Sequence, residues 1–298
     1  MGIKSFIVKK YLAIWEKRDS ERLRKQSFPD GIKEIADIPY INDGTEEHFL
    51  DIYYPEKFTG RLPVIIDIHG GGLVYGGKHL KRIYDGFLSK EGFIVFNINY
   101  RLAWDGVTVF EQIKDVAAAL KWISAHMDGY SADKDRVFIT GDSAGAFLAA
   151  LITLISKSGR LQKLYGTGDI GLTIKAAGLI SGMLYFDKKS LPLAALRSMC
   201  LPKKYKNADL YKNLVFKDLP EITDFPPLYL VSSDEDVLRG MTRHFVKVLS
   251  DMGIPHKFTY LKKEKGGYFG HVHSVMYPES KRGKIVNAEM IEFFRQNM

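Results

Sequence analysis

The sequence predicts an α/β protein in which helices cover both faces of a mostly parallel β-sheet. Short apolar runs suited to buried strands alternate with longer runs of helical periodicity, and glycine-rich turns follow several of the strands. The 298 residues are 46% hydrophobic and 26% charged, which is ordinary for a globular chain. A chain of this length can form one large α/β core with an attached lid.

Residues 1–33 are expected to form a helical lid segment ahead of a main domain at 34–298. Apolar side chains recur there at three- and four-residue steps, as in an amphipathic helix: Ile3, Phe6, Ile7, Tyr11, Ile14 and Trp15. Its basic residues lie largely off this stripe. Such a helix could rest on a membrane surface, but packing against its own protein is the commoner outcome and is favoured.

The pattern predicts about eight strands. Two alternating runs, 34–41 and 48–55, are separated by the turn sequence Asn42-Asp43-Gly44 and indicate an antiparallel pair at one sheet edge. The remaining runs are nearly all apolar, as expected of strands covered on both faces: 62–68, 93–100, 136–140, 174–180, 227–232 and 257–261. Alternation with helices makes most of these strands parallel.

Helical periodicity is expected over 110–127, 146–155 and 285–294. The segment at about 183–223 breaks the alternation and is longer than a normal connection. We therefore expect an inserted lid there, packed with the N-terminal helix. Five lysines of this lid suggest attraction of acidic substrates, although a solvated face is favoured: Lys188, Lys189, Lys203, Lys204 and Lys206.

The sequence Gly141-Asp142-Ser143-Ala144-Gly145 connects the strand at 136–140 to the following helix. A G-x-S-x-G in this context forces a sharp turn, with its central residue in a strained backbone conformation. Small residues on either side leave room for that turn. The serine hydroxyl is lifted clear of the sheet, near the N-terminus of the helix. Ser143 is therefore a candidate nucleophile.

A nucleophilic serine needs donors for the oxygen that becomes negative during the reaction. His69-Gly70-Gly71-Gly72 directly follows the strand at 62–68, where glycines permit consecutive N–H groups to point into a cavity. We expect the N–H groups of Gly71, Gly72 and Ala144 to hold such an oxygen. His69 is expected to brace this loop.

A general base and an acid are also needed, on loops at the same edge of the sheet. His271 and His273 follow the last strand in a glycine-rich loop, and His271 is preferred, while the other histidines fall at element ends or on helices. Asp234, Glu235 and Asp236 follow the preceding strand, and residue chemistry alone does not choose among them. A histidine base predicts activity that rises through pH about 6–7.

Taken together, these motifs resemble the α/β-hydrolase superfamily, in particular its hormone-sensitive-lipase-like esterases. The resemblance covers most of residues 35–298 and rests on five matches: H-G-G-G at 69–72, N-Y-R-L at 99–102, D-x-x-R-V-F-I-T-G-D-S-A-G at 133–145, D-E-D-V-L-R at 234–239 and G-H-V-H at 270–273. H-G-G-G and G-D-S-A-G in this order are specific, whereas either alone is not. Three departures leave the catalytic parts intact: Ala146 for a common glycine, Trp104-Asp105-Gly106 for Ala-Pro-Glu, and His273 for a common aromatic residue.

The resemblance implies an α/β-hydrolase fold with the substrate pocket under the lid. It makes Ser143 the nucleophile, Asp236 the acid and His271 the base, with oxyanion donors at Gly71, Gly72 and Ala144. It also implies hydrolysis of short-chain carboxylic esters, acetyl esters included, without metal or cofactor. A serine peptidase or amidase on the same fold is the main alternative, acetylated sugars are a further candidate substrate, and a non-catalytic binding protein is less favoured because all parts are present.

Charge and composition exclude several other classes of function. The net charge is +8, but no RNA or DNA motif accompanies the basic runs, so nucleic-acid binding is not expected. No apolar run approaches a membrane span, and no signal peptide is expected. The single cysteine, Cys200, excludes an internal disulfide and suits a reducing compartment, so we expect a cytoplasmic location. The oligomeric state stays open, with a homodimer allowed.

Overall fold

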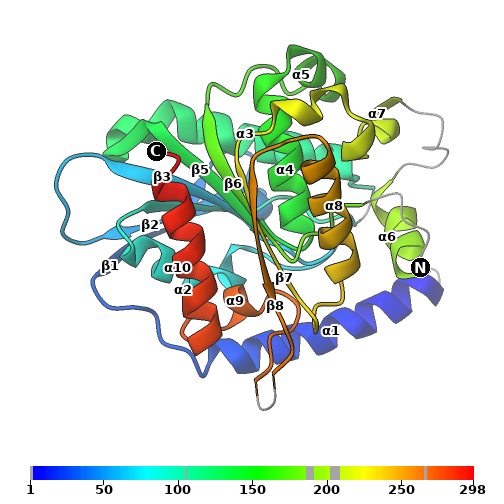
Figure 1. Ribbon diagram of the computed structural model, residues 1–298, viewed down its shortest axis with the longest axis horizontal. Coiled ribbons are helices and arrows are strands. Elements are labelled where there is room, and N and C mark those ends of the chain that lie inside the picture. Colours follow the sequence, from blue (N-terminus) through cyan, green and yellow to red (C-terminus); the bar gives the residue numbers. More distant parts are fainter. Residues whose placement is uncertain (1–2, 105, 186–190, 202–208, 265–266) are drawn as a thin grey trace.

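The computed structural model describes residues 3–104, 106–185, 191–201, 209–264 and 267–298. Its centre is a twisted eight-stranded sheet with the strand order β1-β2-β4-β3-β5-β6-β7-β8 (Figure 1). The strands are β1 (Ile32–Pro39), β2 (Phe49–Pro55), β3 (Leu62–Ile68), β4 (Ile94–Ile98), β5 (Ala132–Asp142), β6 (Ile174–Ile180), β7 (Leu228–Ser233) and β8 (His256–Leu261).

The sheet is mixed, with its antiparallel pairs at one edge. β2 pairs antiparallel with β1 and with β4, and every other pairing is parallel. Each of the eight predicted strands overlaps one of these, so the mostly parallel sheet and its antiparallel edge are confirmed. Apolar runs such as that of β3, in which every residue is buried, made these strands recognisable.

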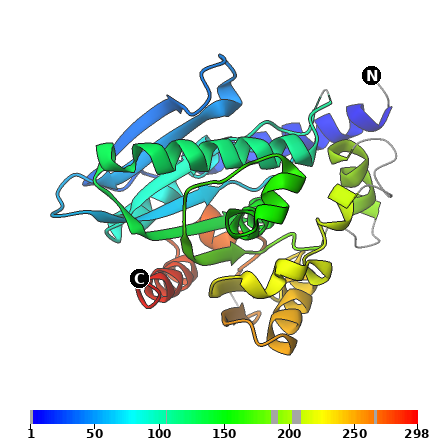
Figure 2. The same cartoon turned by 90° about the horizontal axis from the view of Figure 1, so that it is seen from above.

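Helices cover both faces of the sheet, as seen from above in Figure 2. One face packs against α3 (Val109–His126), α4 (Ala144–Lys157) and α8 (Arg239–Asp251). The other packs against α2 (Arg82–Lys90) and α10 (Lys281–Arg295). The remaining helices are α1 (Ile3–Leu23), α5 (Gly159–Tyr165), α6 (Leu191–Cys200), α7 (Asp209–Lys212) and α9 (His273–Met276).

The register of the central strands sets where the loops meet. Gly141 at the end of β5 lies opposite Ile68 at the end of β3, and opposite Leu179 on β6. Because parallel strands present their C-terminal ends at one edge, the loops after β3 and β5 emerge side by side. The serine turn and the glycine loop after His69 are therefore neighbours.

The N-terminal helix packs against its own protein, as the sequence predicted. The Tyr75 hydroxyl donates a 2.9 Å hydrogen bond to Asp19 of α1, and the Arg22 guanidinium donates one of 3.2 Å to the Met276 carbonyl. These contacts are polar and lie in the second half of the helix. The apolar stripe is only partly covered, since Ile14 and Trp15 are each 43% exposed.

The described part of the 183–223 insertion contains α6, α7 and two short 3₁₀ turns, at Phe216–Asp218 and Pro220–Asp224. Several of its apolar side chains are buried, including Leu214, Phe216 and Leu219. The five lysines predicted to form its basic face all lie outside the described residues.

Membrane-spanning potential is limited in the described part of the chain. No single helix there is both long and apolar enough to cross a bilayer. Only α4 and α5 taken together pass that test of length and composition, and they are bent by 119°.

Candidate active site

A strained turn carries Ser143 between β5 and α4. Its backbone has φ 52° and ψ −114°, a conformation that L-residues rarely adopt. A Cβ at Gly141 would lie 2.5 Å from the Gly145 carbonyl oxygen, and one at Gly145 would lie 2.1 Å from that of Ile68. Both distances are too short for any side chain. The two glycines of G-x-S-x-G are thus required by the close approach of the backbone, as the sequence predicted.

The structure brings together the serine, the histidine and the acid that the sequence singled out. His271 Nε2 lies 3.0 Å from Ser143 Oγ, and His271 Nδ1 lies 2.8 Å from Asp236 Oδ1. These residues are separated by 128 and 35 positions in the chain, yet they form one line of hydrogen bonds. Such an arrangement can pass a proton from a hydroxyl to an imidazole whose orientation a carboxylate fixes.

Asp236 is fully buried and hydrogen-bonded on both oxygens. Ser232 Oγ donates to Oδ2 at 2.6 Å, and the Leu238 backbone N–H donates to Oδ1 at 2.9 Å. Burial raises the pKa of Asp236, but the hydrogen bond and charge of His271, followed by the bonds from Ser232 and Leu238, outweigh it and hold the pKa below its usual value. Asp236 is therefore ionised at neutral pH.

The other two carboxylates of the Asp234-Glu235-Asp236 run have separate partners. Asp234 accepts hydrogen bonds from the Tyr260 hydroxyl at 2.7 Å and the Lys263 N–H at 2.9 Å. Glu235 accepts the Phe269 N–H at 2.9 Å, which ties it to the loop that leads to the histidine. Of these three carboxylates, Asp236 is thus the one in contact with His271.

His273 lies in a different environment from His271. Its Nε2 lies 3.1 Å from Ser280 Oγ, and its ring packs against Phe269 and Tyr277 with centroids 4.8 and 5.1 Å away. Burial lowers its pKa. The residue between the two histidines, Val272, has a left-handed backbone with φ 51°, and this turn separates the directions of their side chains.

The glycine loop after β3 curls beside the serine turn. Gly71 and Gly72 have φ of 109° and 62°, and the Gly71 carbonyl accepts the N–H groups of Val74 and Tyr75. No hydrogen bond within the described residues uses the amide N–H groups of Gly71, Gly72 or Ala144. Three backbone donors at the predicted oxyanion positions are therefore available to a ligand.

His69 braces the start of this loop, as expected. Its buried ring stacks on Tyr100 with centroids 4.3 Å apart and an interplanar angle of 6°. Its Nδ1 lies 2.8 Å from the Gly70 carbonyl, and the Tyr100 hydroxyl donates to the His69 carbonyl at 2.9 Å. Burial lowers the pKa of His69 to about 4, so the ring is neutral at physiological pH.

A buried lysine lies beneath the serine turn, and the sequence analysis missed it. Lys81 Nζ lies 2.6 Å from Asp142 Oδ1 and 3.2 Å from Asp67 Oδ2. The available signal was Asp67 itself, a carboxylate inside a strand expected to be covered on both faces. A buried carboxylate needs a cation or a proton, so Asp67 in this strand indicates a partner nearby.

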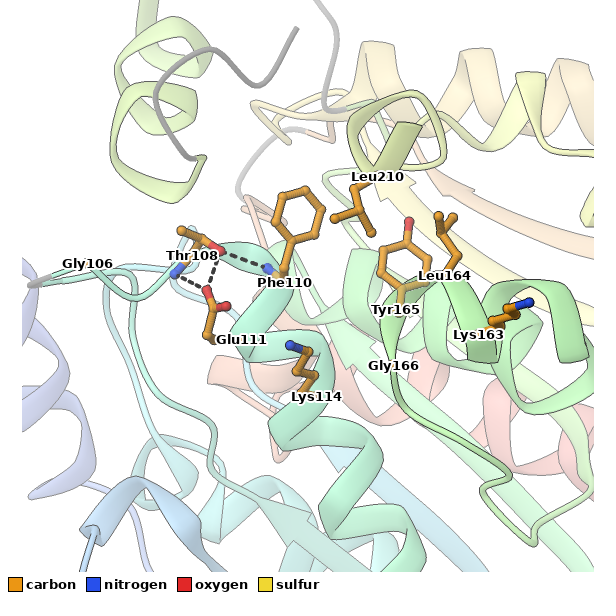
Figure 3. A pocket seen from close by; sticks show the side chains of 10 residues that line it. All are labelled: Gly106, Thr108, Phe110, Glu111, Lys114, Lys163, Leu164, Tyr165, Gly166 and Leu210. Carbon is orange, nitrogen blue, oxygen red and sulfur yellow. Dashed lines mark hydrogen bonds between the residues drawn. The ribbon is translucent and has the colours of Figure 1, made fainter. Parts of the chain in front are cut away.

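A hollow of about 390 Å³ lies between the start of α3, α5 and α7 (Figure 3). The rings of Phe110 and Tyr165 form part of its wall, with Lys114 beside them. None of the residues lining it belongs to the predicted catalytic or oxyanion set. Among the described residues, no three His, Cys, Asp or Glu side chains gather in an arrangement that could hold a metal ion.

Comparison with known proteins identifies the family to which this chain belongs. Esterase B from Lactobacillus rhamnosis, in a crystal structure with a C4-C4 tributyrin phosphonate, matches 98% of this chain and 94% of its own, with a TM-score of 0.91 and 28% sequence identity. The model of the BD-FAE family matches residues 50–184. The chain belongs to the α/β-hydrolase superfamily, among its hormone-sensitive-lipase-like esterases. The resemblance found in the sequence motifs is thus confirmed.

Other members of the superfamily align over shorter stretches or at lower identity. The probable carboxylic ester hydrolase LipM of Mycobacterium tuberculosis is 31% identical over 214 residues, which is 68% of this α/β-hydrolase and 48% of LipM. Esterase LipQ of the same organism is 28% identical over 236 residues, 74% of this chain and 53% of LipQ. The chain thus spans about half the length of these curated relatives. A bacterial heroin esterase at 21% identity and a TM-score of 0.76 shows the fold alone.

Proposed function

We propose that this α/β-hydrolase is a carboxylic ester hydrolase with Ser143 as nucleophile, His271 as general base and Asp236 as the acid that orients the base. The observation that carries the proposal is the continuous line of hydrogen bonds, with 3.0 Å between Ser143 and His271 and 2.8 Å between His271 and Asp236. The similarity to the probable carboxylic ester hydrolase LipM, to esterase LipQ and to esterase B supports the same substrate class.

The reaction proceeds in two acyl transfers. His271 Nε2 takes the Ser143 proton while Oγ attacks the ester carbonyl, and the tetrahedral intermediate collapses as His271 protonates the departing alcohol. Water then enters, His271 takes one of its protons, and the hydroxide attacks the acyl-enzyme. The carboxylic acid leaves as Ser143 regains its proton. Asp236 stays ionised throughout and stabilises the imidazolium.

Gly71, Gly72 and Ala144 are proposed to donate their N–H groups to the oxygen of the tetrahedral intermediate. Each such donor is worth about 3 kcal/mol in the transition state. The positive end of α4 adds to this stabilisation because Ala144 is its first residue. The proposed chemistry uses only groups of the chain and water.

We further propose that the acyl chain is short and that residues 1–33 and the 183–223 insertion form a lid. Crystal structures of esterase B contain a C4-C4 tributyrin phosphonate in one case and a C6-C4 inhibitor in another, which supports short chains. Leu196 of α6 lies close to the donors, since its Cδ1 is 3.9 Å from the position of a Cβ on Gly72. A side chain at that distance limits the room beside the reacting carbonyl. The expected cytoplasmic location and the allowed homodimer stay predictions from the sequence.

The test compares the parent and Ser143→Ala on p-nitrophenyl acetate, butyrate and octanoate. We expect a burst of p-nitrophenol from the parent, higher kcat/KM for acetate and butyrate than for octanoate, and a loss of at least about 1000-fold in the variant. Equal rates for parent and variant would remove Ser143 from its role. An aminopeptidase substrate turned over faster than every ester would favour the peptidase alternative.

A further inference from the structure

The strongest unexplained feature of the molecule is the enclosed ammonium of Lys81. Lys81, which precedes α2, is 2% exposed, and its Nζ contacts Asp142 at 2.6 Å and Asp67 at 3.2 Å. The Nζ also lies 4.6 Å from the centroid of the Tyr84 ring. Burying a cation is unfavourable unless its partners are well placed, so the contacts of this group are informative.

Asp142 connects Lys81 to both halves of the proposed oxyanion site. Its Oδ1 accepts a hydrogen bond from Lys81 Nζ and another, of 3.2 Å, from the Gly70 backbone N–H. Asp142 directly precedes Ser143, and Gly70 directly precedes Gly71. One carboxylate oxygen thus joins the turn of the nucleophile to the loop that carries two of the proposed donors.

Asp67 and Asp85 set the charge on the far side of the lysine. Both are fully buried, and burial raises the pKa of Asp85 well above its usual value, with the charge of Asp67 raising it further. Asp85 therefore keeps its proton. Burial lowers the pKa of Lys81, but the charges of Asp142 and Asp67 outweigh it, so the lysine stays an ammonium.

We propose that Lys81 is a positioning residue for ester hydrolysis, whose ammonium holds the Asp142 carboxylate so that the N–H groups after Gly70 and the Ser143 hydroxyl face one point. This inference rests on the proposed function. Lys81 acts through Asp142, because its side chain is enclosed and its ammonium contacts the carboxylates of Asp142 and Asp67.

The expected kinetic signature follows from this indirect role. Oxyanion donors act at 2.7–3.1 Å from the developing negative charge, and a displacement of about 1 Å can lower a rate about 100-fold. Ground-state binding of the ester depends much less on these donors. Loss of the lysine should therefore lower kcat far more than it changes KM.

The test measures Lys81→Met on p-nitrophenyl butyrate, with active sites counted by stoichiometric release of p-nitrophenol from a p-nitrophenyl phosphonate. We expect kcat per titrated site to fall about 10- to 100-fold, with KM changed by less than about threefold. A lysine that only supports folding would lower the titratable fraction and leave kcat per titrated site unchanged. That second result would overturn the inference.

A double variant covers the case in which Lys81→Met alone does not fold. Lys81→Met/Asp142→Asn removes one positive and one negative buried charge together, so the net buried charge stays that of the parent, and it keeps an oxygen that can accept the Gly70 N–H. We expect it to fold and still to show the low kcat per titrated site, because nothing holds the side chain at 142. The parent value in this double variant would mean that only charge balance matters, and the inference would fail.

Lys78→Met is the matched control. Lys78 Nζ also lies 2.6 Å from two carboxylates, Asp37 Oδ1 and Asp51 Oδ1, but it has no contact with the serine turn. We expect its kcat per titrated site to stay within about twofold of the parent. An equal loss of kcat per titrated site in the control would overturn the assignment to Lys81. A parent that hydrolyses no ester would instead overturn the proposed function, so the two failures are distinguishable.

Discussion

Ser232 Oγ donates a 2.6 Å hydrogen bond to Asp236 Oδ2, the carboxylate oxygen that does not face His271. The other oxygen lies 2.8 Å from His271 Nδ1, so the carboxylate is held at both ends. Ser232 comes from β7 and Asp236 from the loop that follows it, four positions later. The strand thus fixes the rotation of the acid, and through it the tilt of the imidazole.

Ser232→Ala tests whether the hydrogen bond from Ser232 to Asp236 matters for stability and activity. Hydrogen bonds to a charged group contribute about 1.5–3 kcal/mol, so we expect a stability loss of that order in urea unfolding. The pKa of Asp236 should rise, because the lost bond is one of those that lower it. We expect kcat/KM on p-nitrophenyl butyrate to fall about 3- to 10-fold. Ser250→Ala, at an exposed position of α8, is the control, and equal kcat/KM in both variants would contradict the prediction.

The two histidines after the last strand should separate by function. His271→Ala removes the group 3.0 Å from Ser143 Oγ, and we expect kcat to fall at least about 1000-fold with little change in stability. His273→Ala removes a ring packed on Phe269 and a hydrogen bond to Ser280, so we expect about 1–3 kcal/mol lower stability and kcat within about fivefold of the parent. Steady-state kinetics and urea titration of both variants check this. The reverse order of activities would make His273 the base.

His69 should make the protein sensitive to acid. Its folded-state pKa of about 4 lies below the value of 6.5 for a free histidine, so the unfolded chain binds the extra proton between these values. Stability therefore falls as the pH drops from 6.5 towards 4, by about 3 kcal/mol from this one group. The cause is burial, since Nε2 is enclosed with no partner within the described residues, and this outweighs the hydrogen bond between Nδ1 and the Gly70 carbonyl, which raises the pKa.

The measurement is the free energy of unfolding from pH 7 down to 4 for the parent and for His69→Gln. Glutamine keeps an N–H that can donate to the Gly70 carbonyl but does not titrate. We expect a shallower decline in the variant. Parallel curves for the two proteins would show that other groups carry the acid sensitivity.

Most of the sheet could be predicted because its strands are short, nearly uninterrupted apolar runs. β3 and β6 occupy the predicted residues 62–68 and 174–180. Two helices that cover the sheet, α2 and α8, were not predicted. Each is apolar along one side only, as at Met241, Phe245 and Leu249 of α8, and such a stripe is easily overlooked between charged residues.

The candidate site likewise has one part that local sequence predicts and another part that depends on packing. Local sequence predicts the serine turn, because the close backbone approach in any such turn requires glycine at 141 and 145. Local sequence does not choose between His271 and His273, because the directions of their side chains depend on the left-handed backbone of Val272. Packing determines that backbone conformation. The Lys81 contacts also depend on packing: the lysine lies 61 positions before Asp142 in the chain, and only the closeness of β3, β5 and α2 brings the two together.

Gly145→Ala tests the close approach that positions the whole turn. Helix propensity alone would favour alanine by about 1 kcal/mol, since Gly145 is in α4. The added Cβ would lie 2.1 Å from the Ile68 carbonyl oxygen and 2.6 Å from that of His69, both parts of the backbone that cannot yield cheaply. We expect the clash to outweigh this gain, so that the free energy of unfolding in urea falls by about 1–3 kcal/mol. We also expect kcat to fall, because the clash pushes the loop before Gly71 away from Ser143. Gly159→Ala, at the start of α5 with no atom within 4 Å of the new Cβ, should be neutral or up to about 1 kcal/mol stabilising. A Gly145→Ala protein as stable and active as the Gly159 control would mean that the turn and the oxyanion loop are not in the contact on which the proposed chemistry depends.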